Sequence, residues 1–540
     1  MVTEMKQTLL IIAFLISYSV FAQEHAWVYL NDKPNSATAL ANPISILTQK
    51  ALDRKAAHNV AVDYNDVPVD EGFITQIKAQ TGITVLAKSK WLNVVHVLGT
   101  ETNINALTGL PFVDHIEFAD DNLNARQSQN QNKFNIETSQ TVFNYGSAAN
   151  QIEMFNGDDL HLADFTGTGM TVAVLDAGFP NVQTMSGFNR LNTNNGILGG
   201  YDFVDRNTDV YAYTGNAHGT WVLSDMAGYV QDQFVGTAPD AEYYLFRTEN
   251  AATETPIEET LWVEAAERAD SLGVDVINTS LGYTTFDNPN YSYTPAEMDG
   301  QTAFITRGAN FAAQKGMLLV NSAGNSGNSS WQIVGAPADS PNVLSVGAVN
   351  ASGNYASFSS QGSSAQPTQK PDVVAQGQAS YVIGTNDAII TLNGTSFSSP
   401  ILAGGVVCLW QALPTLNNQQ IMQLVRESAS QYNNPDNFLG YGIPDLSLAL
   451  ANGLSLVEFQ NENTKLKVYP NPVSNLLYVE IPSQYDTANV KLYDILGKKV
   501  LEKTVYSTQK KINVSNLSKG VYLAKIEANG LSITKKIIKN

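Results

Sequence analysis

One serine lies in a setting that suits a nucleophile. Ser396 stands among small and hydroxylated residues at 391–400, and an apolar run at 401–409 follows directly. This pattern predicts a tight turn and a buried helix, with Ser396 at the helix N-terminus, where free N–H groups and the helix dipole favour negative charge. Gly394 allows close backbone approach, and Pro400 falls about one turn into the helix. Ser and Thr are also common N-caps, so a capped core helix is the alternative.

A serine hydroxyl attacks a carbonyl only with help from a base, which in turn needs an orienting carboxylate. The chain has six histidines, and only His161 and His218 lie in its central part. His218 begins an amphipathic helical pattern at 218–228, which could place it at the same edge of a sheet as Ser396. A histidine at a helix start can equally be a structural residue without chemistry.

Two further polar residues follow apolar runs. Asp176 ends the run 170–175, and a carboxylate at the end of a buried strand is costly unless it is paired. Asn325 lies in a glycine-rich segment, 321–327, where its amide could donate to an oxyanion beside the Ser396 N–H. Asp176 is therefore a candidate orienting acid and Asn325 a candidate oxyanion donor, although both residue types are also common in ordinary turns.

The elements that would position these residues alternate between strands and helices. A helical pattern covers 257–272, and apolar, β-branched runs typical of buried parallel strands occur at 170–175, 243–246, 274–278, 316–320 and 342–347. The succession predicts an α/β domain, a parallel sheet with helices on both faces and its chemistry at the carboxyl ends of the strands. The order Asp, His, Asn, Ser excludes the α/β-hydrolase arrangement, which needs a histidine after Ser396.

The flanking regions differ in composition from this central part. Residues 9–16 are apolar and small residues follow at 20–22, as in a secretory signal; starting at Met5 would give it a cleaner charged leader. Strand and helix patterns then alternate up to about residue 118, which predicts a small α+β domain. The chain thus divides into a signal peptide (1–22), an α+β domain (23–119), an Asn-, Gln- and Ser-rich linker (120–150), the α/β domain (151–455), a second linker (456–466) and a small β-sandwich (467–540).

Composition limits the classes of function. A chain of 540 residues is expected to form two or more domains, and a net charge of −19 argues against nucleic-acid binding. The single cysteine, Cys408, excludes intrachain disulfides and multi-cysteine metal sites, and we expect it to be a buried hydrophobic residue. Residues 467–540 contain 12 Lys, no Arg and 5 acidic residues, a local net charge of +7 that marks a module with its own partner.

Together these motifs resemble the subtilisin-like serine proteases, the subtilase family. The resemblance covers residues 151–450 and rests on the segments around Asp176 (175–178), His218 (218–220), Asn325 (323–325) and Ser396 (394–396, with Pro400). The segment Ser280, Leu281 and Gly282 resembles the one that lines the substrate pocket and pairs with the substrate backbone. Larger or more polar residues than the family usually has stand at Leu223, Ser224, Phe397 and Ser398.

The resemblance implies a secreted serine endopeptidase made as a pre-pro-protein, with Asp176, His218 and Ser396 as catalytic triad and Asn325 in the oxyanion hole. It implies protein or peptide substrates, no required cofactor and no catalytic metal. Structural calcium is common in the family, and acidic loops such as 202–209 could hold it, without an assigned site. Residues 23–119 resemble the family's propeptide, a folding aid and inhibitor, with maturation cleavage expected within 121–150.

Residues 467–540 resemble a type IX secretion sorting domain, through the segments 469–472, 493–497 and 517–522. This implies a Gram-negative cell, a partner in the outer-membrane secretion machinery, no transmembrane segment in the mature chain, and a location outside the cell or at its surface. A carbohydrate- or surface-binding sandwich is the alternative for this domain. For the whole chain, the alternative is a catalytically silent binding protein with the subtilase fold.

Overall fold

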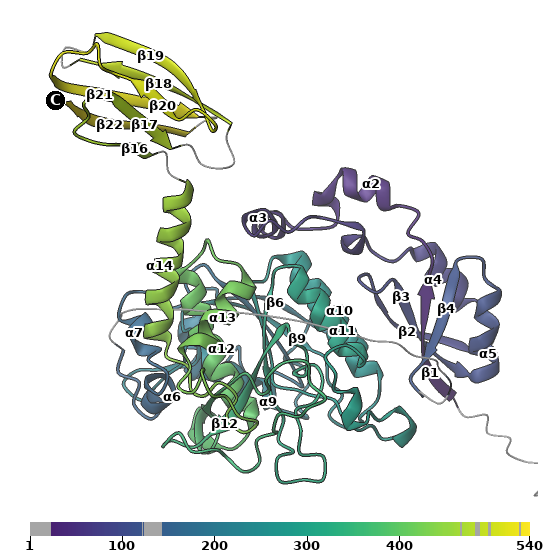
Figure 1. The fold of residues 1–540 in the computed structure, drawn as a ribbon. Coiled ribbons are helices and arrows are strands. Elements are labelled where there is room, and N and C mark those ends of the chain that lie inside the picture. Colours follow the sequence, from purple (N-terminus) through teal and green to yellow (C-terminus); the bar gives the residue numbers. More distant parts are fainter. Residues whose placement is uncertain are drawn as a thin grey trace, which may run out of the picture. The chain divides into compact units, whose positions relative to one another are not determined.

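The computed structural model describes residues 23–120, 123, 143–464, 467–480, 486–494, 498–528 and 531–540. The chain forms two compact units, Met1–Gly453 and Leu454–Asn540 (Figure 1). The predicted signal peptide and most of the predicted linker 120–150 lie outside the described residues. Most of the expected second linker, 456–466, continues helix α14 (Leu446–Thr464).

A seven-stranded sheet forms the centre of the first unit. Its order is β13-β12-β11-β10-β5-β9-β6, and every neighbouring pair is parallel. The strands are β5 (Thr171–Asp176), β6 (Ile197–Asp202), β9 (Glu242–Arg247), β10 (Val276–Thr279), β11 (Leu318–Ser322), β12 (Val343–Val349) and β13 (Val373–Gln376). The predicted parallel α/β architecture is confirmed, and each predicted strand overlaps an observed one.

The sequence patterns missed the two outermost strands, β6 and β13. β6 contains Gly199 and Gly200, and it lacks the continuous apolar run of the central strands because as an edge strand it has a neighbour on one side only. β13 is only four residues long and follows a Pro- and Gln-rich segment at 366–371. Neither segment carries a pattern that separates a short edge strand from a loop.

Helices cover both faces of this sheet (Figure 1). The helix α12 (Thr395–Ala412) packs on β10 to β13 and against α9 (His218–Ala227). On the other face, α10 (Ile257–Leu272) and α11 (Phe304–Gln314) pack against each other and the sheet. α12 is buried along nearly its whole length, so its N-terminus is held in a fixed position at the sheet edge.

The N-terminal domain is a four-stranded antiparallel sheet of order β2-β3-β1-β4 with short helices, which agrees with the predicted α+β class. Its strands are β1 (Gln23–Leu30), β2 (Ile83–Ser89), β3 (Val94–Thr100) and β4 (Val113–Phe118), and its α-helices are α2 (Ser36–Ala41), α3 (Gln49–Ala57), α4 (Glu71–Lys78) and α5 (Glu101–Ala106). One face of this sheet packs on α10 and α11: Trp27 stacks on Phe304 with ring centroids 4.2 Å apart, and its indole N–H donates to Thr260.

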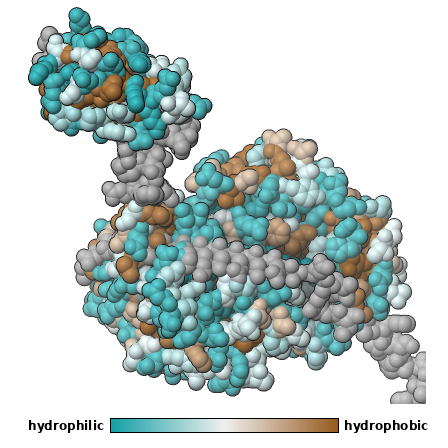
Figure 2. Space-filling view, viewed as in Figure 1, coloured by the Kyte–Doolittle hydropathy of each residue, from teal (hydrophilic) through white to brown (hydrophobic). Residues whose placement is uncertain are grey.

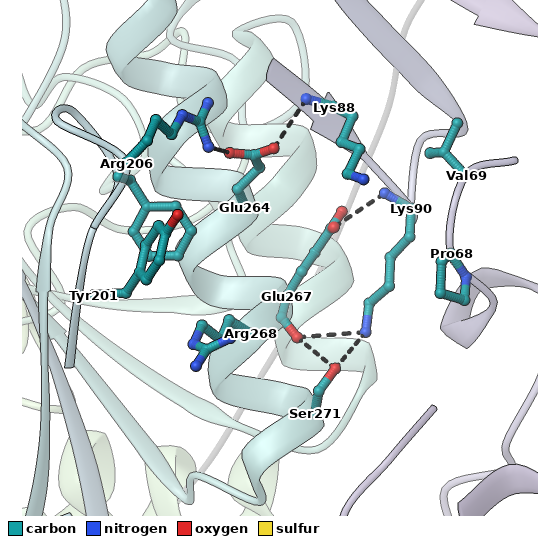
Figure 3. Close-up of a pocket in the computed structure, with 11 residues that line it drawn as sticks. Pro68, Val69, Lys88, Lys90, Tyr201, Arg206, Glu264, Glu267, Arg268 and Ser271 are labelled. Atoms are coloured by element: carbon teal, nitrogen blue, oxygen red, sulfur yellow. Dashed lines mark hydrogen bonds and ion pairs between the residues drawn. The ribbon is translucent and has the colours of Figure 1, made fainter. Parts of the chain in front are cut away.

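Carboxylates of α10 hold the turn between β2 and β3 (Figure 3). The buried Glu267 side chain accepts hydrogen bonds from the Ser89 hydroxyl at 2.6 Å and from the backbone N–H groups of Lys90 and Trp91 at 3.0 Å. Lys90 Nζ donates to the hydroxyl of Ser271 one turn further along α10. Beside these contacts lies an open cavity of about 450 Å³, lined by residues of both domains.

Helix α3 makes a second attachment, through buried ion pairs. Arg54 and Lys55 contact Asp270 of α10 at 2.5 and 3.0 Å, and the side chains of all three are at most 3% exposed. Breaking a buried pair leaves an uncompensated charge, which is costly, so these contacts fix the N-terminal domain on α10 specifically.

The second unit is a β-sandwich, as predicted. Its sheets, β16-β17-β20 and β19-β18-β21-β22, enclose one apolar core. The strands are β16 (Lys467–Tyr469), β17 (Leu476–Glu480), β18 (Thr487–Tyr493), β19 (Lys499–Tyr506), β20 (Lys511–Asn513), β21 (Gly520–Ala528) and β22 (Leu531–Lys539). Brown apolar surface gathers on this domain among polar residues in Figure 2. Within the described part of the chain, no helix has the length and apolar character to cross a membrane.

Candidate active site

The candidate residues meet at the carboxyl edge of the parallel sheet. β5 lies between β9 and β10, and the strands that follow β9 are added on the other side of β5. Such a reversal of strand order opens a crevice at the carboxyl ends. Asp176 is the last residue of β5, Ser280 follows β10, and Asn325 lies three residues beyond β11.

Asp176 and His218 form a hydrogen bond. The His218 Nδ1 atom lies 2.8 Å from Asp176 Oδ1, which also accepts the Ala177 N–H at 2.7 Å. The Asp176 side chain is fully buried, and its Oδ2 has no hydrogen-bond partner among the described residues. Since the carboxylate can only accept, Nδ1 carries the proton and donates it in this hydrogen bond, which leaves Nε2 unprotonated and free to accept a proton.

The electrostatic setting of His218 favours its protonated form. Burial opposes protonation, but the charge of Asp176 and the hydrogen bond to it, with a contribution from Glu249, outweigh this and raise the pKa of His218 above 6.5. Because the site stabilises an imidazolium, it can hold a proton taken from a neighbouring hydroxyl.

Ser396 is the second residue of α12 and is 8% exposed. Its Oγ donates to the Ser280 carbonyl oxygen at 3.3 Å and, among the described residues, forms no hydrogen bond with His218. Catalytic hydrogen bonds are often long or misaligned without substrate, so the missing bond is compatible with proton transfer from Ser396 to His218 during the reaction.

Pro400 lies inside α12 and has a structural consequence at Ser396. Its missing N–H leaves the Ser396 carbonyl without the usual i+4 helix donor. The Ser280 hydroxyl donates to this oxygen instead, at 2.8 Å. Ser280 therefore fixes the first turn of the nucleophile helix from the neighbouring strand end.

The amide orientation of Asn325 follows from its contacts. Its Oδ1 accepts the Thr395 N–H at 2.8 Å and the Thr395 hydroxyl at 3.0 Å. A backbone N–H can only donate, so the atom facing it is the oxygen, and Nδ2 is left as a donor beside Gly394. Gly324, with φ at +98°, makes the turn that brings Asn325 there.

Phe397 and Ser224, which differ from the residues usual in the family at these positions, pack behind the site. Phe397 is buried, and its ring centroid lies 6.1 Å from that of His218. The Ser224 hydroxyl donates to the Trp221 carbonyl and accepts the Ile383 N–H, so it ties α9 to strand β14 (Ser380–Ile383). These larger or polar side chains are accommodated without entering the Asp176–His218 contact.

A cavity of about 570 Å³ opens beside His218. Ser280 and Leu281 of the predicted substrate segment line it, together with Trp221 and Glu249. Sequence reasoning missed Glu249, although it stands two residues after β9 and the rule that found Asp176, a carboxylate at a strand end, applies to it as well. Gly282 is not among the lining residues but continues the same segment.

The loop expected to suit calcium carries carboxylates that are already paired. Asp202 and Asp205 both accept from Arg247 Nη1, at 2.8 and 2.7 Å. An arginine thus occupies the position of a cation, and these residues do not fit a metal site. Across the described ranges, no group of three or more His, Cys, Asp or Glu side chains could hold a metal ion.

Three family models match the chain. The subtilase family matches residues 167–442, the Bacteroidota propeptide domain of peptidase S8 matches 25–135, and the secretion system C-terminal sorting domain matches 467–540. These matches fall on the α/β domain, the N-terminal domain and the β-sandwich.

Individual proteins are also similar. Subtilisin DY of Bacillus licheniformis is 30% identical over 281 residues, 52% of this chain and 90% of the relative. Subtilisin E of Bacillus subtilis (strain 168) is 32% identical over 304 residues, 55% of this chain and 70% of the relative. The crystal structure of MycP1 from the ESX-1 type VII secretion system has a TM-score of 0.45 and 25% identity, covering 59% of this chain and 91% of that one.

Proposed function

Since the chain belongs to the subtilase family, and is a serine endopeptidase, we propose that Asp176, His218 and Ser396 are its catalytic triad. The observation that carries this proposal is the 2.8 Å contact between His218 Nδ1 and the fully buried Asp176. It supports a histidine that is oriented and ready to accept a proton on Nε2.

The reaction is acyl transfer in two steps. His218 Nε2 takes the proton of Ser396 Oγ as the oxygen attacks the scissile carbonyl carbon. The resulting oxyanion receives hydrogen bonds from the Ser396 N–H and from Asn325 Nδ2. His218 then donates its proton to the leaving amine. A water molecule, deprotonated by the same nitrogen, attacks the acyl-enzyme, and His218 returns this proton to Ser396 Oγ as the acid product leaves.

The substrate backbone lies along the segment Ser280, Leu281 and Gly282. We base this on its place after β10, next to Ser396, and on Ser280 and Leu281 lining the cavity beside His218. No cofactor takes part in this scheme.

The remaining parts of the chain prepare and export the enzyme. The propeptide domain, 23–119, inhibits the catalytic domain, 151–455, until cleavage within 121–150. The sorting domain, 467–540, engages the outer-membrane secretion machinery and is removed on export. The enzyme then acts outside a Gram-negative cell or at its surface, after a signal peptide, 1–22, has directed the chain out of the cytoplasm.

The test compares purified wild type with Ser396→Ala. Wild type should hydrolyse peptides and release its propeptide, whereas the variant should remain as uncleaved precursor without activity. Equal processing and hydrolysis in both would disprove the mechanism. N- and C-terminal sequencing of the secreted wild-type form would fix both ends of the mature chain.

A further inference from the structure

The cavity beside His218 contains an acidic group that the reaction itself does not use. Glu249 follows β9 and lines the cavity together with Trp221 and Leu281. Glu249 is 9% exposed as a residue, and among the described residues that line this cavity no other carries a carboxylate. Of the described residues that line it, Glu249 is therefore the one that can present a negative charge to a bound peptide.

A buried hydroxyl holds the carboxylate in place. Glu249 Oε1 accepts a short hydrogen bond from the Tyr283 hydroxyl, and Tyr283 is fully buried. Within the described part of the chain, Oε2 accepts no hydrogen bond, and no Lys or Arg pairs with the carboxylate. One oxygen is thus fixed and the other is available to a ligand. A buried carboxylate without a cation is costly, so its retention needs a reason.

The charges around Glu249 are mostly negative. Burial, with smaller contributions from Glu254 and Asp176, raises the pKa of Glu249 to about 8, against the lowering effects of Tyr283 and His218. Glu258 of α10 also interacts with it. The setting therefore disfavours a further anion and favours an incoming cation, which would restore the ionised form of Glu249.

Building on the proposed function, we propose that this cavity receives an Arg or Lys side chain of the substrate, and that Glu249 selects for that positive charge near the scissile bond. The apolar stem of such a side chain packs against Trp221 and Leu281, and its charged end reaches Oε2. The predicted substrates are proteins cut close to a basic residue.

The chain's own maturation segment fits this preference. Residues 121–150 contain only two basic residues, Arg126 and Lys133. Both lie in the stretch that must be cut to separate the propeptide from the catalytic domain. Self-processing can therefore place one of these side chains in the cavity, and the mature N-terminus is expected within a few residues of Arg126 or Lys133.

The preference should depend on pH. With the cavity empty, the carboxyl of Glu249 loses its proton only around pH 8, so at lower pH binding a cation must also displace that proton. Discrimination between a charged side chain and its neutral analogue should therefore grow as the pH rises from 6 to 9 and then level off.

The experiment uses the processed enzyme and quenched peptides that carry either Arg or its neutral isostere citrulline, scanned through the positions around the scissile bond. At one position, kcat/KM for Arg should exceed that for citrulline by about tenfold or more at pH 9, as expected for a partly buried charge pair. In Glu249→Gln this ratio should fall to about one, while the matched variant Glu254→Gln, on the same loop between β9 and α10, should keep it.

Labelling by a fluorophosphonate probe shows whether each variant is folded and active. If Glu249→Gln is not labelled, the pH dependence of the ratio in wild type decides the question. A ratio near one at every position and pH, or a ratio that persists in labelled Glu249→Gln, overturns the assignment of Glu249. Wild type that neither takes the label nor cleaves peptides instead overturns the proposed function on which it rests.

Discussion

Ser280 and Ser396 exchange two hydrogen bonds. The Ser280 hydroxyl donates to the Ser396 carbonyl at 2.8 Å, and the Ser396 hydroxyl donates to the Ser280 carbonyl at 3.3 Å. The first bond replaces the one that Pro400 cannot make within α12. The nucleophile helix is therefore anchored to the end of β10 by a side chain rather than by the helix itself.

Removing the Ser280 hydroxyl should destabilise the protein. Ser280→Ala leaves the buried Ser396 carbonyl unpaired, which typically costs about 1–3 kcal/mol. Unfolding in urea, measured on precursors that carry Ser396→Ala to prevent autolysis, gives the size of the effect. If Pro400 is the reason why the Ser396 carbonyl lacks a helix donor, Ser280→Ala should lower the free energy of unfolding less in a Pro400→Ala background. An equal loss in both backgrounds would refute the claim that the Ser280 hydroxyl replaces the donor missing at Pro400.

Losing the Asn325 amide should slow the chemical step. Asn325→Ala removes the donor that Thr395 orients, and loss of one oxyanion donor lowers kcat by about a hundred- to a thousandfold. KM should change little, because the interaction forms with the oxyanion and not with the ground-state carbonyl. Steady-state kinetics on one peptide tests this, with the exposed Asn433→Ala as a control; a loss confined to KM would argue against the oxyanion role.

The pH profile of activity should fall on its acid side at the pKa of His218. The base works in its neutral form, so activity is present above the pKa of His218 and is lost as the pH falls through it. Since Asp176 raises that pKa above 6.5, the limb should lie above 6.5. Asp176→Asn should move the limb to lower pH and reduce kcat by about 10⁴-fold. A limb unmoved by Asp176→Asn would show that another group titrates.

The propeptide interface should weaken in acid. His25 Nδ1 lies 3.0 Å from His96 Nε2, and the fully buried His96 contacts the Thr260 hydroxyl of α10 at 2.7 Å. Burial lowers the pKa of His25 to about 4 and that of His96 well below 6.5. Both rings are neutral when folded, so their stability contribution is complete above pH 6.5 and is lost as the pH falls towards 4.

This dependence can be measured on the Ser396→Ala precursor. Its urea midpoint should fall between pH 7 and pH 4.5, and His96→Asn should lessen that fall. His115→Asn changes an exposed histidine of the same domain and should leave it unaltered. If His96→Asn retained the full pH dependence, other groups would be responsible.

Local patterns in the sequence predict much of this site. Apolar β-branched runs mark the buried strands, and polar residues directly after them, such as Asp176, mark the reactive edge. The same rule points to Glu249, but many polar residues follow strands, and only the fold shows which of them line one cavity. The Ser280–Ser396 exchange is a contact between residues 116 positions apart, which the pattern around either residue does not encode.

The attachment of the N-terminal domain shows a similar limit. Its strands are readable from hydrophobic alternation, but the partners of Arg54 and Lys55 lie on α10, more than 200 residues away. Charged residues on a short helix usually face solvent, so their burial at an interface has no local signature. Edge strands such as β6 were missed for a related reason, since half of their environment comes from elsewhere in the chain.

The most direct test of the proposed triad is the site at which a fluorophosphonate probe reacts. Mass spectrometry of the labelled, processed enzyme should locate one adduct on Ser396, and Asp176→Asn and His218→Ala should label far more slowly while remaining folded. An adduct on another serine, or no adduct on correctly processed protein, would contradict the triad and favour a non-catalytic binding protein on the same scaffold.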